Sequence, residues 1–145
     1  MKQISTHLSE IVNVSSGQLK KLSPQDWEFR KAPGKWSHKE ILGHLIDSAA
    51  NNHQRFVRAQ YGDKTPISYD GNAWVNVEKH HDAPTENLIG LWSFYHLHLA
   101  HIISTIPKEK FNVLFYADAE EPKTLEWLVQ DYMHHLVHHL RQILP

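Results

Sequence analysis

The chain has 145 residues, a length at which one domain with a well-buried core is the simplest expectation. Hydrophobic residues make up 41% and charged residues 21%, and the formal net charge of −1 gives no support for binding nucleic acid through its phosphates. The absence of cysteine excludes disulfides, cysteine-ligated zinc and a thiolate nucleophile of the protein's own. The 13 histidines are the one compositional feature that suggests chemistry.

The sequence also bears on where the protein works. No apolar run approaches the roughly 18 residues that a membrane-spanning helix needs. The first residues, MKQISTHLSEIVN, lack the apolar core of a signal peptide. We therefore expect a cytoplasmic protein that neither crosses a membrane nor binds nucleic acid, with residues 1–145 forming a single domain.

The first two predicted helices lie before residue 61. One spans roughly Lys2 to Leu22, where apolar residues recur at helical spacing. A turn-rich stretch, LSPQDWEFRKAPGKW, follows it. The second helix begins after Ser37, which fits a capping box with Glu40, and it runs to about Gln60.

A loop of about 20 residues, YGDKTPISYDGNAWVNVEKHHDA, comes next and is long enough to suggest a function of its own. The third predicted helix follows this loop. Asp82 is expected to be its N-cap and Pro84 its first-turn proline. An apolar stripe continues from there to Ile106.

The last predicted helix runs from Leu125 to about Leu144, with Thr124 as its cap. A strand-like pattern is confined to a few residues around Phe111 to Tyr116. Four amphipathic helices of roughly 20 residues predict an all-α protein, a four-helix bundle. The two long connections argue against the simplest up-down-up-down form with short loops.

The last helix contains MHHLVHHLRQI, in which four histidines divide between two faces. On a helical wheel His135 and His139 border the apolar arc, whereas His134 and His138 fall on the opposite flank. A purification tag or a solvated basic tail would show no such sorting. Residues four apart have Cβ atoms about 5–6 Å from each other, so the first pair can bind one ion. Taken alone this spacing is a weak signal, and two amphipathic residues at a core edge would produce it too.

His44 occupies the same border of the apolar arc on the second helix. Polar residues continue its stripe for three turns, which suggests a lined pocket, although a solvated helix face gives the same pattern: Asp47, Ser48, Asn51 and Arg55. Together, His44, His135 and His139 would supply three neutral imidazoles. Three protein ligands with an open fourth position are typical of catalytic zinc sites. That position could hold a water molecule or a substrate atom.

The other histidines are expected to lie away from this site. They fall in the long loop, at the flanks of the third helix or on the surface: His80, His81, His96, His98, His101, His7, His38 and His53. No glutamate stands between His135 and His139, so the HExxH pattern of zinc proteases is absent. A group that assists a metal hydroxide would have to be a residue such as Asp47 or Asp131.

Three segments closely resemble the DinB/YfiT-like proteins, which include bacillithiol transferases: PGKWSHKEILGHLIDSAANNHQRF, PISYDGNAW and HLVHHLRQI. The likeness covers nearly the whole chain. It implies a four-helix bundle with a long crossover, often assembled as a homodimer, and a divalent metal, nickel or zinc, held by three histidines. Carried over position by position, these ligands are His44, His135 and His139.

The same resemblance places the loop around Tyr69, Asp70 and Trp74 over the metal. It implies thiol S-transfer or thiol-dependent isomerisation, while many members carry only the description of metal-dependent hydrolase. Because the chain has no cysteine, the leading expectation is an enzyme that activates a small thiol cosubstrate and joins it to an electrophile. Three residues are expected to assist catalysis. Asp47 would orient a ligand or accept a proton, Arg55 would hold an anionic substrate group, and Tyr69 would belong to the loop that closes the pocket.

Two alternatives stay open. A metal-dependent hydrolase would use metal-bound hydroxide and would need no thiol. A non-catalytic metal-binding or dimerisation module would bind the ion without turnover. Three imidazoles suit nickel and zinc alike, so the sequence does not choose the metal.

Overall fold

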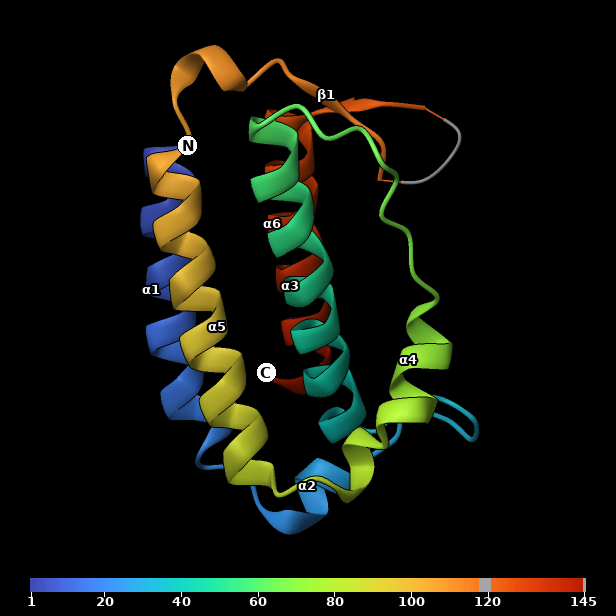
Figure 1. Cartoon of the computed structure of the whole chain (residues 1–145). Helices are drawn as coiled ribbons and strands as arrows, with labels where there is room; N and C mark the ends of the chain where they lie inside the picture. Colours follow the sequence, from blue (N-terminus) through green and yellow to red (C-terminus); the bar gives the residue numbers. More distant parts are fainter. Residues whose placement is uncertain (118–120, 145) are drawn as a thin grey trace.

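Figure 1 shows the computed structural model, which describes residues 1–117 and 121–144. The described residues are mostly helical, and four helices have 18 or more residues: α1 (Lys2–Leu19), α3 (His38–Gln60), α5 (Thr85–Thr105) and α6 (Leu125–Ile143). Shorter elements join them: α2 (Pro24–Glu28), α4 (Gly71–Glu78), the 3-10 turns η1 (His80–Asp82) and η2 (Lys108–Lys110), and the strands β1 (Leu114–Phe115) and β2 (Lys123–Thr124). The prediction of an all-α helical bundle is confirmed.

The directions of the long helices explain the long crossover. α1 and α6 run one way through the bundle, and α3 and α5 run the other way (Figure 1). α1 packs against α5, α5 against α3, and α3 against α6. Because the neighbours α3 and α5 are parallel, residues 61–84 must return along the length of α3 before α5 can begin. This return path carries α4 past the side of α3.

α3 begins where the sequence predicts, because its capping box forms. The Glu40 amide donates to Ser37 Oγ at 3.2 Å, and the Glu40 carboxylate accepts from the Ser37 amide at 2.7 Å. Arg30 donates to the same carboxylate at 2.6 Å. Three hydrogen bonds therefore fix the start of the helix, nearly two turns before His44.

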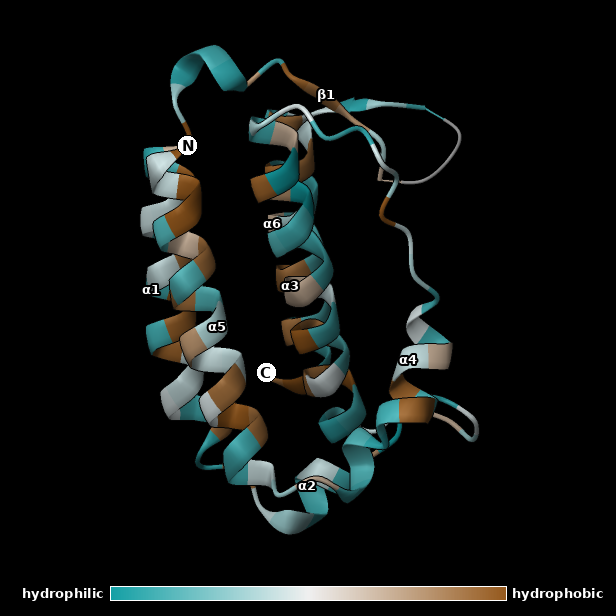
Figure 2. Ribbon diagram, viewed as in Figure 1, coloured by the Kyte–Doolittle hydropathy of each residue, from teal (hydrophilic) through white to brown (hydrophobic). Residues whose placement is uncertain are grey.

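Apolar positions recur along α1, α3 and α5 between hydrophilic ones (Figure 2), and the buried ones form a continuous core between the long helices. Its largest fully buried side chains include Trp92, Phe56 and Phe115. His96 is part of this core, with 0% of its surface exposed. The expectation that His96 only flanks the apolar stripe is therefore wrong. Its Nδ1–H donates to the Trp92 carbonyl at 2.7 Å, which satisfies half of the buried ring.

The connections differ most from the sequence-based expectation. α2 and α4 lie in stretches that were expected to be irregular, and they have only five and eight residues, too few for helical periodicity to be recognised. The predicted cap at Asp82 is wrong, because Asp82 belongs to η1 and α5 begins at Thr85 with Pro84 as its N-cap. α1 ends at Leu19, three residues before its predicted end.

The segment around Phe111 to Tyr116 does contain a strand. β1 pairs antiparallel with β2, with Leu114 opposite Thr124 and Phe115 opposite Lys123. The pair closes the end of the bundle above the start of α6, where Thr124 Oγ1 accepts the Trp127 amide at 3.1 Å. In the part of the chain that the structure describes, no helix is both long and apolar enough to cross a membrane.

Candidate metal centre

Three histidines from two neighbouring helices converge on one point. His44 comes from α3, and His135 and His139 come from α6. One ring nitrogen of each lies within 4.8 Å of those of the other two, and Nε2 of His44 is 3.1 Å from Nε2 of His135. The structure therefore brings together the three residues that the helical wheels and the resemblance selected.

The division of the histidines on α6 follows from its helical register. His135 and His139 are one turn apart on the side that faces α3, and their ring centroids are 4.5 Å apart. His134 and His138 are exposed on the other flank. The side chain of His138 is hydrogen-bonded to the Gln142 amide at 3.0 Å and takes no part in the cluster.

The electrostatics of the cluster favour neutral imidazoles. Burial lowers the pKa of His44 to about 3, and the nearby charges of His135, His139 and His80 act in the same direction. Burial also lowers the pKa of His139 to about 4, with smaller contributions from His135 and His138. The pKa of His135 is lowered by burial as well, against the opposing charge of Asp131. At neutral pH each ring therefore keeps the lone pair that a metal ion requires.

Two of the three rings have a partner on the nitrogen that faces away from the cluster. Ser48 Oγ lies 3.4 Å from Nδ1 of His135, and the Gln142 amide lies 3.3 Å from Nδ1 of His139. Both contacts orient an imidazole, and the Ser48 hydroxyl can also accept the Nδ1 proton of His135 and so leave Nε2 for the metal. Nδ1 of His44 is buried and has no hydrogen-bond partner among the described residues.

These observations fit a divalent ion held by three imidazoles. The donors are neutral, they converge, and no fourth histidine, cysteine or carboxylate of the described residues joins the group. A three-histidine set leaves a coordination position for water or substrate, as in catalytic zinc sites. The ligand set suits nickel and zinc equally.

Aromatic rings and a glycine cover the cluster. The Trp36 ring centroid is 4.6 Å from that of His44 and 6.3 Å from that of His139. Tyr69 lies 6.5 Å from His44 on the crossover, and Trp74 lies 5.5 Å from Tyr69. A Cβ atom at Gly71 would come within 3.1 Å of the His44 ring, so the start of α4 rests directly on this ligand.

Trp36 is a residue of the site that the sequence-based prediction lacks. Its position one residue before the Ser37 cap was the available signal, because a residue at that position packs beside the first turns of the helix. Asp70, by contrast, does not face the cluster through its carboxylate. Its Oδ1 accepts the amides of Asn72 and Ala73 at 2.9 and 3.1 Å and caps α4.

The three residues expected to assist catalysis lie along α3 or beside it. Asp47 has 2% of its surface exposed, and both of its carboxylate oxygens are 3.0 Å from Nε2 of His80. Arg55 donates to the Ile67 carbonyl through Nε and Nη2, at 3.0 and 2.6 Å. Tyr69 is half-buried, and burial raises the pKa of its hydroxyl.

The position of His80 corrects the expectation that the loop histidines lie away from the site. His80 has 5% of its surface exposed and bonds to Asp47, one turn along α3 from His44. Its neighbour His81 is more exposed and pairs with Glu28 at 3.2 Å. The sequence held no signal for this difference, because two adjacent histidines in a loop carry no periodicity.

The fold and the three converging histidines define a helical-bundle protein with a candidate metal centre. Comparison with known families gives the particular group. The family model of the DinB superfamily matches residues 8–143, so the chain belongs to this superfamily.

Individual relatives agree with this assignment. The chain is 28% identical over 146 aligned positions to a Bacillus subtilis (strain 168) protein named "Putative metal-dependent hydrolase YfiT", covering 99% of the chain and 78% of that protein. The solved structure of YfiT, described as a probable metal-dependent hydrolase with an unusual four-helix bundle topology, superposes with a TM-score of 0.82 at 22% identity and covers 98% of this chain and 85% of its own. A DinB-like protein of Bacillus subtilis, YjoA, superposes with a TM-score of 0.64 at 20% identity, over 97% and 87% of the two chains. These two likenesses concern the fold.

Proposed function

We propose that the protein is a metal-dependent enzyme that transfers a small thiol to an electrophile. The observation that carries the proposal is the convergence of three neutral imidazoles, with no fourth ligand among the described residues, in a chain without cysteine. His44, His135 and His139 would hold nickel or zinc. The bound ion would lower the pKa of a thiol so that the thiolate predominates near neutral pH.

The balance of the reaction is simple. The sulfur of the thiolate forms a bond to an electrophilic carbon, the leaving group departs with its bonding electrons, and the thiol proton passes to solvent. Trp36 and Tyr69 would keep water from the reacting atoms, since their rings lie beside His44, and Trp74 packs against Tyr69. Because both oxygens of Asp47 face His80, we assign Asp47 an orienting role. Arg55 would bind an anionic group of the substrate while it keeps its hydrogen bonds to the crossover.

Hydrolysis by metal-bound hydroxide is the second candidate. The description of YfiT as a metal-dependent hydrolase favours it. It uses the same three histidines, because the open position accepts water as readily as a thiol. The two candidates differ in the cosubstrate that they require.

A screen separates them. The purified protein, loaded with zinc or nickel, is incubated with a panel of common cellular thiols and a chlorinated aromatic electrophile, and in parallel with activated esters and amides without thiol. We expect conjugate formation that needs both the metal and a thiol. Ester or amide turnover without thiol would assign the hydrolase instead, and no turnover of either kind would assign a non-catalytic metal-binding module.

We further propose that the protein is cytoplasmic and that it forms a homodimer, the assembly that the resemblance implies. Sedimentation equilibrium of the metal-loaded protein tests the assembly. A mass of about two chains is expected, and the mass of one chain would contradict the proposal.

A further inference from the structure

The crossover ends in a buried ion pair that takes no direct part in the bond making of the proposed reaction. Asp47 on α3 and His80 in η1 have 2% and 5% of their surfaces exposed, and Nε2 of His80 donates between the two carboxylate oxygens at 3.0 Å. Glu78 lies 3.6 Å from the same nitrogen, but its side chain is 45% exposed. A carboxylate so deeply buried is stable only because the imidazole is held against it.

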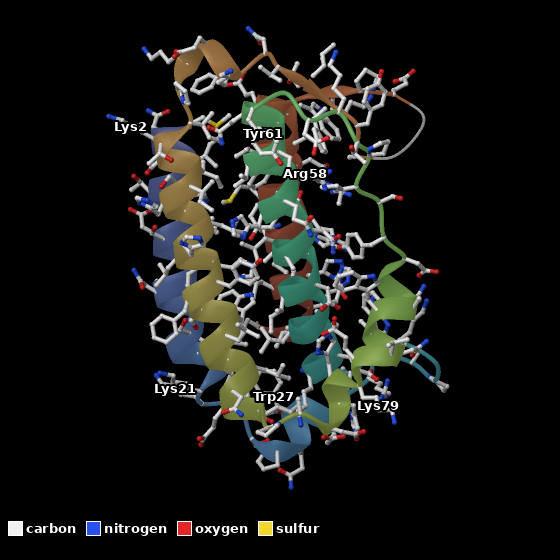
Figure 3. All side chains as sticks on the ribbon, in the orientation of Figure 1. Lys2, Lys21, Trp27, Arg58, Tyr61 and Lys79 are labelled. Carbon is white, nitrogen blue, oxygen red and sulfur yellow. The ribbon has the colours of Figure 1, made fainter. Side chains whose placement is uncertain are left out.

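The backbone directs His80 to this position. Lys79, labelled in Figure 3, ends α4 in the left-handed conformation with φ of 51°, the one positive φ of a non-glycine residue in the described ranges. This turn sends the chain back toward α3. The ring of His80 then lies on Gly43, where any Cβ atom would overlap it. An unfavourable backbone conformation at Lys79 and the absence of a side chain at Gly43 thus both allow His80 to pack against α3.

The charge of His80 agrees with an ion pair. Burial opposes protonation, but the hydrogen bond and charge of Asp47, with smaller contributions from Glu78 and Glu40, outweigh it and raise the pKa of His80. His44 also interacts electrostatically with His80, and the low pKa of the His44 ring leaves this ring neutral. His80 is therefore in contact with the carboxylates of Asp47 and Glu78, and the charge of Glu40 acts on it from a greater distance.

The pair is one of several polar attachments of the crossover to α3, which also include the Arg58–Asp63 pair at the start of the crossover. Another is Arg55, which donates to the carbonyl of Ile67. Between the attachment at Ile67 and the buried pair lie Tyr69 and Gly71, the residues that cover His44. The segment over the metal centre is thus held at both of its ends.

We propose that the Asp47–His80 pair is a positioning element of the metal centre, which holds α4 against His44 and thereby slows the release of the ion. Neither residue is a ligand in this proposal. It rests on the three-histidine site of the proposed function but not on any particular reaction. Loss of the pair should loosen the cover without removing a donor atom.

The first measurement is amide hydrogen exchange of the full chain in the metal-free state. We compare the wild type with His80→Gln and Asp47→Asn, and use His81→Gln as the matched control. His81 lies in the same turn and also pairs with a carboxylate, but its side chain is 40% exposed. We expect the amides of α4 to exchange at least about tenfold faster in both test variants, with α1 unchanged.

The second measurement is the rate at which the zinc-loaded protein gives up its ion to a chromogenic chelator in excess. We expect His80→Gln and Asp47→Asn to release zinc at least about tenfold faster than the wild type, while His81→Gln does not. The amount bound should remain one ion per chain. This readout separates positioning from ligation, because removal of a ligand would lower the amount as well as the rate.

Several results would overturn the proposal. One is an equal rate of amide exchange in α4 of His80→Gln and His81→Gln. Another is a rate of zinc release that neither test variant changes. A third is two bound ions in the wild type and one in His80→Gln, which would make the pair a cation site. Unfolding of one test variant, seen by circular dichroism, leaves the other as the decisive variant. Faster release without turnover of any substrate would leave this inference standing and overturn the proposed enzyme instead.

Discussion

Ser48 and Gln142 show how the residues behind the ligands prepare the centre. Each places a polar atom within 3.4 Å of the Nδ1 atom of a histidine, Ser48 beside His135 and Gln142 beside His139. The Ser48 hydroxyl can accept the Nδ1 proton of His135, which favours the tautomer in which Nε2 is free, whereas the Gln142 amide donates to Nδ1 of His139 and only orients that ring. Orientation of the donors is therefore built into α3 and α6 before any ion binds.

The Ser48→Ala variant tests this role. We expect the Kd for zinc to rise roughly 10- to 100-fold, because the imidazole of His135 loses the contact that orients it. Ser93→Ala is the control, since the Ser93 hydroxyl bonds to Ser16 and to the Ile89 carbonyl on the opposite side of the bundle. Equal zinc affinity of the two variants in a competition titration would show that Ser48 does not orient the ligand.

His96 makes the stability of the fold depend on pH. Burial lowers the pKa of His96 to about 4, whereas an unfolded histidine titrates near 6.5. Between these values the unfolded chain binds more protons at this residue than the folded chain does, so the free energy of unfolding falls as the pH falls from 6.5 to 4. At pH 5 this contribution is a loss of about 2 kcal/mol relative to pH 7.

The His96→Leu variant should lack this contribution. We expect the free energy of unfolding of the wild type, relative to the variant, to be lower at pH 5 than at pH 7 by about 2 kcal/mol. Urea unfolding of both proteins in chelator provides the measurement, and the other histidines cancel in the comparison. Parallel pH dependences would contradict the assignment of a neutral, buried His96.

At the scale of the elements, α3 combines a predictable helix with one exceptional position. Its start at the Ser37 cap and its end at Gln60 follow from local sequence, namely a capping box and a regular apolar arc. The need for glycine at position 43 is explained by tertiary structure alone, because the atoms that exclude a Cβ there belong to His80. Alanine would otherwise be preferred at an interior position of a helix.

Alanine substitution at two glycines tests that account. Gly43→Ala should lower the free energy of unfolding by about 1–3 kcal/mol, since the new methyl group displaces His80. Gly90→Ala on α5 should raise it by up to about 1 kcal/mol, because no atom lies within 4 Å of the added Cβ. Chemical denaturation measures both values. A Gly43→Ala protein as stable as Gly90→Ala would mean that His80 is not seated on the helix.

The same contrast explains which parts of the site the sequence predicts. His135 and His139 are related by a helical spacing, and His44 by its place on the border of an apolar arc, so local periodicity finds all three. His80 and Asp47 are 33 residues apart in the sequence. They meet because of the left-handed turn at Lys79 and because Gly43 of α3 has no side chain. Neither feature has a periodic signature. α4 was missed for a related reason, since eight residues are too few to show a pattern.

At the scale of the whole molecule, the centre joins two helices whose contact is otherwise made by core side chains. α3 and α6 pack directly, and the three histidines lie at the edge of that contact. An ion that binds only the folded chain must therefore stabilise the whole bundle. The topology itself was only partly predictable, because amphipathic periodicity gives the number of long helices but not their directions.

Removal of the metal should lower the thermal stability. At a free zinc concentration about 100 times the Kd, binding adds about 3 kcal/mol to the free energy of unfolding. We expect the melting temperature of the wild type to fall when a chelator is added. The melting temperature of His135→Ala should not respond to zinc or to chelator. If neither zinc nor chelator changes the melting temperature of the wild type, no ion links the two helices.

The central claim is that His44, His135 and His139 together hold one divalent ion. Metal analysis of the purified wild type beside His44→Ala, His135→Ala and His139→Ala tests it most directly, with His134→Ala as the exposed control from the same helix. We predict about one nickel or zinc ion per chain in the wild type and the control, and substantial loss in each of the three variants. Wild-type metal content in all three variants would contradict the claim.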